Sequence, residues 1–143
     1  DPLGLVHAAR AALVAAKAAL EACRKQGYQV GVAVVDRAGI TQVFLRDRFA
    51  GPHTVDVAIN KAWTASSFGL STLVWNQVVG QPATAPLAHH PRVMAVGGGV
   101  PAVAGGRVVG AIGVSGGNAQ QDHDVAVAAL EAVGMSSSSQ SDS

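Results

Sequence analysis

The sequence predicts an α/β fold of the α+β type, in which a single antiparallel sheet is flanked by helices. Three observations lead to this prediction. Strand-like runs fall into two groups with short turns between neighbouring runs, which is typical of hairpins. Helical patterns lie before, between and after these groups, and no alternation of single strands with helices suggests a parallel sheet. The 143 residues are enough for one domain with its own core.

The first expected element is a helix over residues 3–26. Its apolar residues, from Leu5 to Cys23, recur at spacings of three and four, and charged residues occupy the other side. Gly27 provides a stop for this helix. We interpret Cys23, the single cysteine of the chain, as a small core residue rather than a reactive thiol.

The rest of the chain alternates between strand-rich and helical stretches. Pro52 suits the start of the helix that follows it, and Ser71 and Asp122 are suitable N-cap residues for the last two helices. In chain order we expect strands over 29–36 and 40–46, helices over 54–68 and 71–79, a loop over 80–92, strands over 93–96, 100–103 and 107–114, and a helix over 122–133. The sheet therefore has five strands. Residues 1–134 form the domain, and 135–143 are expected to be a disordered Ser-rich tail.

The composition limits the partners of this domain. Apolar residues make up 49% of the chain and charged residues only 13%, so part of the surface is expected to be covered by other copies of the chain. The net charge is +1 with scattered basic residues, which argues against a nucleic-acid partner. No apolar run approaches the roughly 20 residues of a membrane span. Because the chain starts at Asp1 without Met, we expect that a signal peptide, tag or other segment once preceded it.

Glycine clusters at 97–99, 105–106 and 113–117 are a prominent feature of the second half. None of them fits a phosphate-binding pattern, because none lies between a strand and a helix with the required spacing. Two interpretations remain open. The glycines form tight turns and close strand contacts, or a flat ligand passes over a glycine-rich face.

His53 is the histidine best placed to reach a ligand. It lies in the segment 51–54, Gly-Pro-His-Thr, at a junction of loop and helix, where it could bind a haem iron or cap the helix. Arg46 and Arg48 precede this segment and could hold carboxylates, or could pair with Asp47 or a neighbouring subunit. No histidine shows the spacing of a zinc site. The other histidines are expected on the surface: His7, His89, His90 and His123.

An enzyme that acts on a small carbonyl or hydroxy-acid substrate is a second hypothesis. His53, Asp56 and Asn60 fall on one face of the predicted helix, and Lys61 could supply an amine. Lys61 could equally form a structural ion pair. No G-x-S-x-G segment is present, and no catalytic residue is assigned. An assembly module without a small ligand is a third hypothesis.

Five segments, in order over residues 3–134, resemble the GlcG/HbpS family. They read VAVVDRAG, LRDRFAGPHT, NKAWTA, GGGVP and GGRVVGAIGVSGG, and Asp122 follows the last of them. The AGPHT form of the middle loop is similar to the HbpS branch. The chain lacks an E-x-x-E or D-x-x-E cluster of the kind associated with iron binding in a secreted relative.

The resemblance implies a five-stranded antiparallel sheet flanked by helices, a homo-oligomer that is often an octamer, and a secreted or cell-surface location. It also implies a tetrapyrrole ligand, with haem first and cobalamin as the alternative, and a role in haem sensing, uptake or protection against oxidative stress. The related C-terminal domain of PduO-type corrinoid adenosyltransferases also binds haem. We expect His53 to be the axial ligand of the iron. The other expected site residues are Arg46, Arg48, Thr54, Lys61, Gly98, Gly99 and Gly116.

Overall fold

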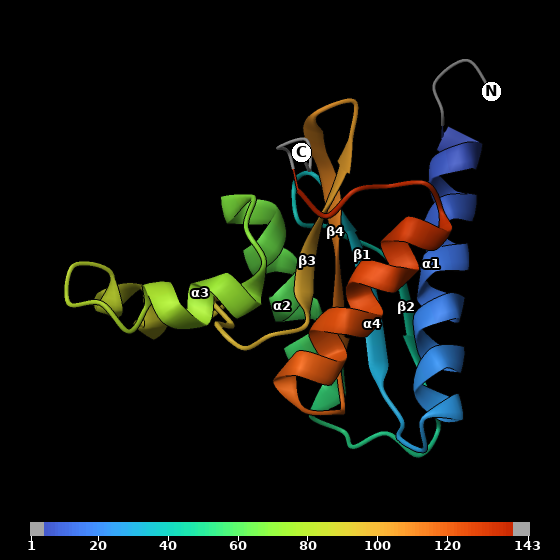
Figure 1. The fold of residues 1–143 in the computed structure, drawn as a ribbon, viewed down its shortest axis with the longest axis horizontal. Coiled ribbons are helices and arrows are strands. Elements are labelled where there is room, and N and C mark those ends of the chain that lie inside the picture. The colour runs from blue at the N-terminus through green and yellow to red at the C-terminus, as the bar shows by residue number, and fades with distance from the viewer. Residues whose placement is uncertain (1–4, 139–143) are drawn as a thin grey trace.

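Four α-helices and one antiparallel sheet make up the fold in a computed structural model that describes residues 5–138, with side chains from residue 8 onward (Figure 1). Within these residues no helix is long and apolar enough to cross a membrane. The elements are α1 (Leu5–Lys25), β1 (Gly31–Asp36), β2 (Thr41–Arg46), α2 (Thr54–Phe68), α3 (Thr72–Val78), the 3-10 helix η1 (Ala85–His89), β3 (Gly99–Ala104), β4 (Arg107–Ser115) and α4 (Ala119–Ala132).

The sheet has four strands in the order β2-β1-β4-β3, and every neighbouring pair is antiparallel. The prediction of five strands is therefore wrong, because residues 93–96 form no strand. Side chains from the neighbouring helices bind the backbone of this segment instead. Thr64 accepts a hydrogen bond from the Met94 backbone nitrogen at 2.9 Å, and Thr72 donates to the Val96 carbonyl at 2.6 Å. With these groups already bonded to side chains, the segment does not pair with a strand.

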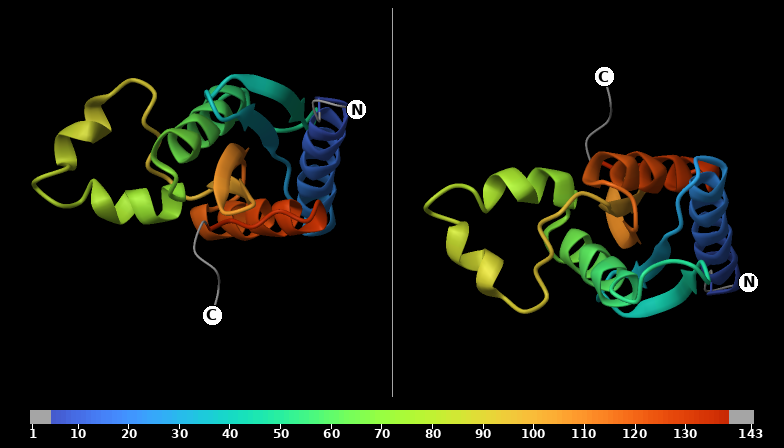
Figure 2. Two further views of the ribbon diagram at one scale, coloured as in Figure 1. Left: turned by 90° about the horizontal axis from the view of Figure 1, so that it is seen from above. Right: turned by 90° about the horizontal axis from the view of Figure 1, so that it is seen from below.

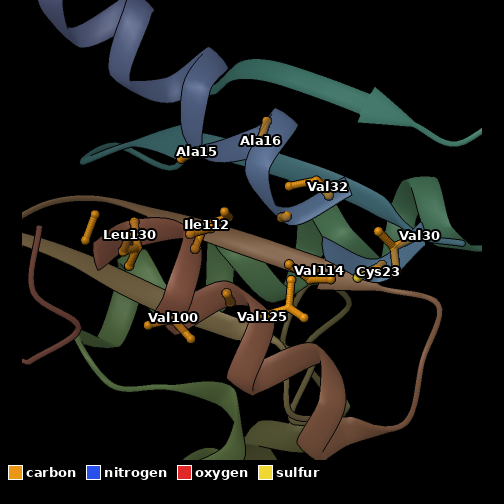
Figure 3. Packing of buried hydrophobic residues seen from close by; sticks show 14 residues of the cluster. Ala15, Ala16, Cys23, Val30, Val32, Val100, Ile112, Val114, Val125 and Leu130 are labelled. Carbon is orange, nitrogen blue, oxygen red and sulfur yellow. The ribbon is translucent and has the colours of Figure 1, made fainter. Parts of the chain in front are cut away.

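Helices cover both faces of the sheet (Figure 2). α1 and α4 pack together on one face, and α2 lies on the other. The side chains of Val32 and Ile112 belong to the core under α1 and α4, whereas Ala33 and Ala111 belong to the core under α2. This alternation follows from the two-residue period of a strand. Figure 3 shows that the core under α1 and α4 is built mainly from Ala, Val, Leu and Ile side chains.

α2 lies unusually close to the sheet. Its buried face carries three alanines, Ala58, Ala62 and Ala65, which are fully buried. Gly113 of β4 faces them, and a Cβ atom at this position would lie 2.0 Å from the Ala58 carbonyl oxygen. Such a distance is far below any van der Waals contact, so only glycine allows this approach. The close approach at Gly113 is thus made by the backbone of α2, and not by a neighbouring strand.

The helix boundaries agree with the sequence except at α4. α2 has the predicted bounds, and Ser71 caps α3 by accepting a hydrogen bond from the Val74 backbone nitrogen. α4 begins at Ala119 rather than Asp122, because Asn118 and Gln121 form a capping box at its start. Asp122 is therefore free for another role inside the domain.

The segment from α3 to residue 92 forms an arm that projects from the body of the domain (Figure 1, Figure 2). Several apolar side chains on and beside it are exposed, including those of Leu70, Val74 and Leu87. At the other end of the chain, Met135 packs against the core and Ser136 pairs with Val103. Of the predicted tail, 139–143 lie outside the described residues, as do 3–4 of the predicted first helix.

The contact between α2 and β4 predicts a large effect of Gly113→Ala. The added methyl group has no space, so we expect a loss of about 3 kcal/mol or more in the free energy of unfolding, measured by urea denaturation. Gly105→Ala is the control. Gly105 has a φ of +59° but open space around it, so only the left-handed backbone opposes the change, at a cost of about 1–2 kcal/mol. Equal losses in the two variants would contradict the proposed close contact.

Candidate functional site

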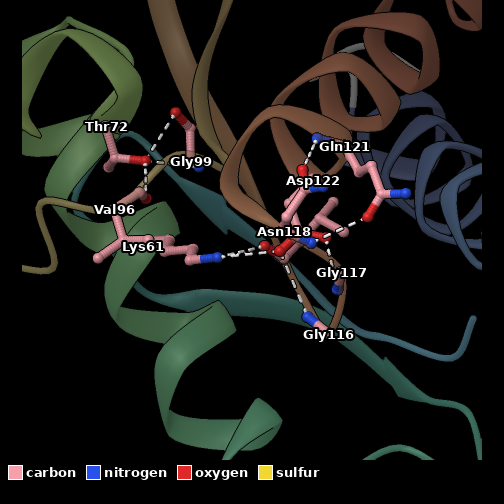
Figure 4. A network of polar contacts seen from close by, with 10 residues as sticks. Lys61, Thr72, Val96, Gly99, Gly116, Gly117, Asn118, Gln121 and Asp122 are labelled. Atoms are coloured by element: carbon pink, nitrogen blue, oxygen red, sulfur yellow. Dashed lines mark hydrogen bonds and ion pairs between the residues drawn. The ribbon is translucent and has the colours of Figure 1, made fainter.

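A buried ion pair joins α2 to α4 (Figure 4). The Lys61 Nζ atom lies 3.3 Å from Asp122 Oδ2 and donates a hydrogen bond to the Val114 carbonyl at 2.9 Å. Lys61 is 2% exposed and Asp122 is 1% exposed. The backbone nitrogens of Gly116 and Gly117 donate to the two carboxylate oxygens at 3.3 Å and 2.9 Å. Asp122 therefore ties the turn after β4 to Lys61.

The surroundings of the pair are closed. A Cβ atom on Gly98 would lie 2.3 Å from the Val114 carbonyl oxygen and 2.9 Å from Lys61 Nζ. The Thr72 hydroxyl holds the adjacent turn by accepting a hydrogen bond from the Gly99 backbone nitrogen at 2.8 Å. Burial lowers the pKa of the Lys61 amine and raises that of the Asp122 carboxyl, and each partner opposes the change in the other. The arrangement matches a structural ion pair better than an amine that meets a substrate.

A second group of predicted residues lies on the loop between β2 and α2. Arg46 donates a hydrogen bond to the Ala50 carbonyl at 2.9 Å, and the Arg48 guanidinium lies 5.0 Å from the centre of the Phe49 ring. His53 is exposed at the N-cap position of α2, where its side chain makes no capping hydrogen bond. The imidazole therefore does not act as a cap. Thr54 is buried and donates to the Gly51 carbonyl at 2.6 Å.

An ion pair with α1 holds this loop. Arg24 Nε lies 2.6 Å from Asp47 Oδ2, and the Asp47 carboxylate also accepts a hydrogen bond from the Phe49 backbone nitrogen. The hydrogen bond from Arg24 lowers the pKa of Asp47. Asp47 is buried, and it pairs with Arg24 instead of the arginines on either side of it. The predicted pairing of Asp47 with Arg46 or Arg48 is replaced by this contact.

The predicted site residues thus fall into two groups. Lys61, Gly98 and Gly116 lie beside Asp122, which the sequence predicts as a helix cap, and Gly99 lies against the Lys61 backbone. Arg48 and His53 lie on the surface loop, and Arg46 is the last residue of β2 before it. Thr54 and Lys61 are seven residues apart on α2, or about 10 Å. Lys61 is therefore not brought to the surface beside His53 and Asp56, as the enzyme hypothesis requires.

The remaining histidines differ in exposure. His89 is exposed, and His90, also exposed, stacks on Trp63 with ring centres 5.3 Å apart. His123 is half-buried, and its Nδ1 atom is buried without a hydrogen-bond partner, so the prediction of a surface position is wrong in part. Desolvation lowers the pKa of His123. The side chain of His7 lies outside the described residues.

Sequence reasoning missed an apolar pocket of about 500 Å³ between α1, the sheet and the end of α4. Five alanines of α1 line one wall, and Asp36 and Gln42 are the polar residues of the lining among the side chains that the structure describes. The signal in the sequence was the run of alanines on the apolar side of α1. Periodicity identifies that side but does not show whether side chains from the sheet fill the space beside it.

We expect the buried ion pair to contribute to stability as a coupled unit. Lys61→Met leaves the Asp122 carboxylate buried without its cation, and the expected loss is about 3–5 kcal/mol in the free energy of unfolding. Combining Lys61→Met with Asp122→Asn removes both charges, so the double variant should be more stable than the sum of the single losses predicts, by about 1–3 kcal/mol. Urea denaturation of the four proteins measures this coupling. Strictly additive losses would show that the pair is not coupled.

The half-buried His123 predicts a loss of stability in acid. Its pKa is below the ordinary value in the folded chain, so the unfolded chain binds the proton more readily. Stability should therefore fall as the pH drops through the ordinary histidine pKa of 6.5 and below. Melting temperatures of the wild type and His123→Gln between pH 7.5 and pH 5 test this, and the variant should lose less on acidification. His89→Gln, at an exposed position, is the control and should behave like the wild type. A wild-type slope in His123→Gln would contradict the assignment.

Comparison with known proteins finds relatives over nearly the whole chain. The family model described as "Haem degrading protein HbpS-like" matches residues 8–131. A crystal structure of a double mutant of Streptomyces reticuli HbpS superimposes with a TM-score of 0.82 and 38% sequence identity, and covers 87% of this chain and 84% of HbpS. A crystal structure of a PduOC–haem complex has a TM-score of 0.82 and 28% identity over 90% of this chain and 96% of PduOC.

A longer curated relative matches in part of its length. The corrinoid adenosyltransferase PduO of Salmonella typhimurium is 34% identical over 121 residues, which are 82% of this chain but only 36% of the enzyme. This chain therefore corresponds to only part of that enzyme, whereas the family model covers most of this chain. On that match, together with the resemblance in fold to HbpS, the protein belongs to the HbpS-like family.

Proposed function

We propose that this protein binds haem, and that it does so as a homo-oligomer. The observation that carries the proposal is its membership of a family whose description names haem, together with its close structural similarity to PduOC, which was crystallised with haem. The degradation that the family description names requires haem to be bound first. Binding is therefore the function to test.

The loop between β2 and α2 has suitable donors for haem. A haem iron needs one axial imidazole, and His53 offers an exposed ring that is not used to cap its helix. Arg48 is exposed on the same loop and Arg46 at the end of β2 beside it, and a guanidinium suits a propionate carboxylate. The ring of Phe49 is 74% exposed and could cover apolar macrocycle surface. Bound haem would supply a redox-active iron at this loop.

The residues around Asp122 fit a supporting role. Lys61 is buried and ion-paired, and Gly98 and Gly99 face it without space for a planar ligand. Thr54 is buried beneath the first turn of α2 and bonds to the Gly51 carbonyl. In this proposal these residues set the position of α2, and α2 sets the position of His53.

Self-association and an exported location are part of the proposal. The loop is open to solvent, so a bound macrocycle would need a second surface to cover its other face. The apolar side chains exposed on the projecting arm, such as Leu70 and Val74, favour contact with another copy of the chain. An octamer and export from the cell are what the resemblance to the HbpS branch implies. Sedimentation or native mass measurement gives the number of copies.

Haem titration tests the ligand and the site separately. We expect a saturable shift of the Soret band in the wild type. His53→Ala should weaken binding about tenfold or more and change the position of the band, since the axial ligand is lost. Arg48→Gln should weaken binding less than tenfold without moving the band, because it removes one charge-assisted hydrogen bond.

His89→Ala is the matched control, because this exposed histidine lies far along the chain on the projecting arm. It should bind haem like the wild type. Without a saturable shift in the wild type the proposed function fails. A normal spectrum in His53→Ala overturns the axial ligand and leaves haem binding intact.

A further inference from the structure

The apolar pocket beside α1 differs in chemistry from the loop that carries His53. It has a volume of about 500 Å³, within the usual range for small-molecule sites. Ala8, Ala12 and Ala15 line it from α1, and Val34, Ala102 and other small side chains line it from the sheet. Met135, after α4, contributes a flexible apolar side chain.

The space exists because small side chains meet at this end of the domain. Alanines on α1 lie opposite Ala102 and Gly110 on the strands, so side chains leave the space between these positions unfilled. Further along α1, Val30 and Val32 fill the space between this helix and the sheet, and both belong to the core under α1 and α4 (Figure 3). The pocket is thus a space between α1 and the sheet that side chains do not fill.

Asp36 gives the pocket a negative charge. Its Oδ1 atom accepts hydrogen bonds from the Ala38 and Ile40 backbone nitrogens at 2.9 Å and 3.0 Å, and its Oδ2 atom accepts one from Gln42 Nε2 at 3.1 Å. These bonds fix the carboxylate at the end of β1. Among the side chains that the structure describes, no Lys, Arg or His lines the pocket. An anionic ligand would therefore be repelled, whereas a neutral or cationic ligand would not.

We propose that this pocket is a second binding site, for a neutral or cationic apolar small molecule, and that Asp36 excludes anionic ligands from it. Haem carries two propionates, so its charge suits the arginines of the β2–α2 loop and not this pocket. The charge of Asp36 and the size of the pocket carry the argument, and neither depends on haem binding at the loop.

A pair of fluorescent probes with the same aromatic core tests the proposal. N-phenylnaphthylamine is neutral, and anilinonaphthalene sulfonate adds one negative charge to the same rings. We expect the wild type to bind the neutral probe saturably and the anionic probe about tenfold more weakly. Asp36→Asn keeps the shape of the side chain but removes its charge. In this variant the anionic probe should bind more tightly than to the wild type, so that its affinity approaches that of the neutral probe.

Two pocket variants and one control locate the site. Ala104 and Ala9 are exposed residues of the lining, so Ala104→Trp and Ala9→Trp should fill the pocket without disturbing the core, and each should weaken binding of the neutral probe tenfold or more. Because Ala9 lies on α1 and Ala104 on β3, one variant still tests the site if the other fails to fold. Ala128→Trp, at an exposed position of α4 outside the lining, should bind like the wild type.

Other outcomes overturn the proposal. The wild type could bind no neutral probe, or could bind the anionic probe equally well. Haem could displace the neutral probe, which would make this pocket the haem site. The pocket variants could lower the mass of the assembly, which would make this face an interface between copies of the chain. In contrast to these outcomes, loss of haem binding in His53→Ala with unchanged binding of the neutral probe would support the proposal, because it shows that the two sites are separate.

Discussion

Lys61 reaches from α2, on one face of the sheet, to Asp122 on α4, which lies on the opposite face. The two side chains can meet because Gly98 occupies the point between them, where a Cβ atom would lie 2.9 Å from Lys61 Nζ. Buried charges are costly unless they are paired and hydrogen-bonded, so the separation of α2 and α4 is fixed at this point. The same helix begins at His53, and the loop before it is anchored to α1 through Asp47. The position of the candidate ligand-binding loop therefore depends on contacts made in the interior.

Charge separates the two candidate sites more clearly than shape does. The β2–α2 loop exposes Arg48 and His53, and Arg46 is exposed beside it at the end of β2. The pocket beside α1 has a mainly apolar lining to which Asp36 adds a carboxylate. With only 13% charged residues in the chain, a few side chains decide the local potential. A dianionic macrocycle and an uncharged aromatic molecule would thus be directed to different places on one small domain.

The elements that could be predicted from the sequence are those with strong local signals. Repeating apolar spacing identified α1, and Ser71 identified the start of α3. The failures arose where a residue's partner is distant in the chain. Residues 93–96 have strand-like composition, but side chains of α2 and α3 take their backbone hydrogen bonds. Asp122 has the chemistry of a helix cap, yet Lys61, 61 residues earlier, binds it. The pocket was missed because volume depends on both of its walls.

The contacts of the interior leave little freedom, whereas the loop before α2 is exposed. PduOC shares this fold at 28% identity with a TM-score of 0.82, so most side chains can change while the backbone arrangement stays. In this chain the glycines and the ion pair leave almost no freedom where α2 meets the sheet, as the 2.0 Å approach at Gly113 shows. The loop residues Arg48, Phe49 and His53 are exposed, and their replacement would leave the core contacts intact. Residues of the loop can therefore change at little cost in stability, so the fold alone does not fix what the loop binds.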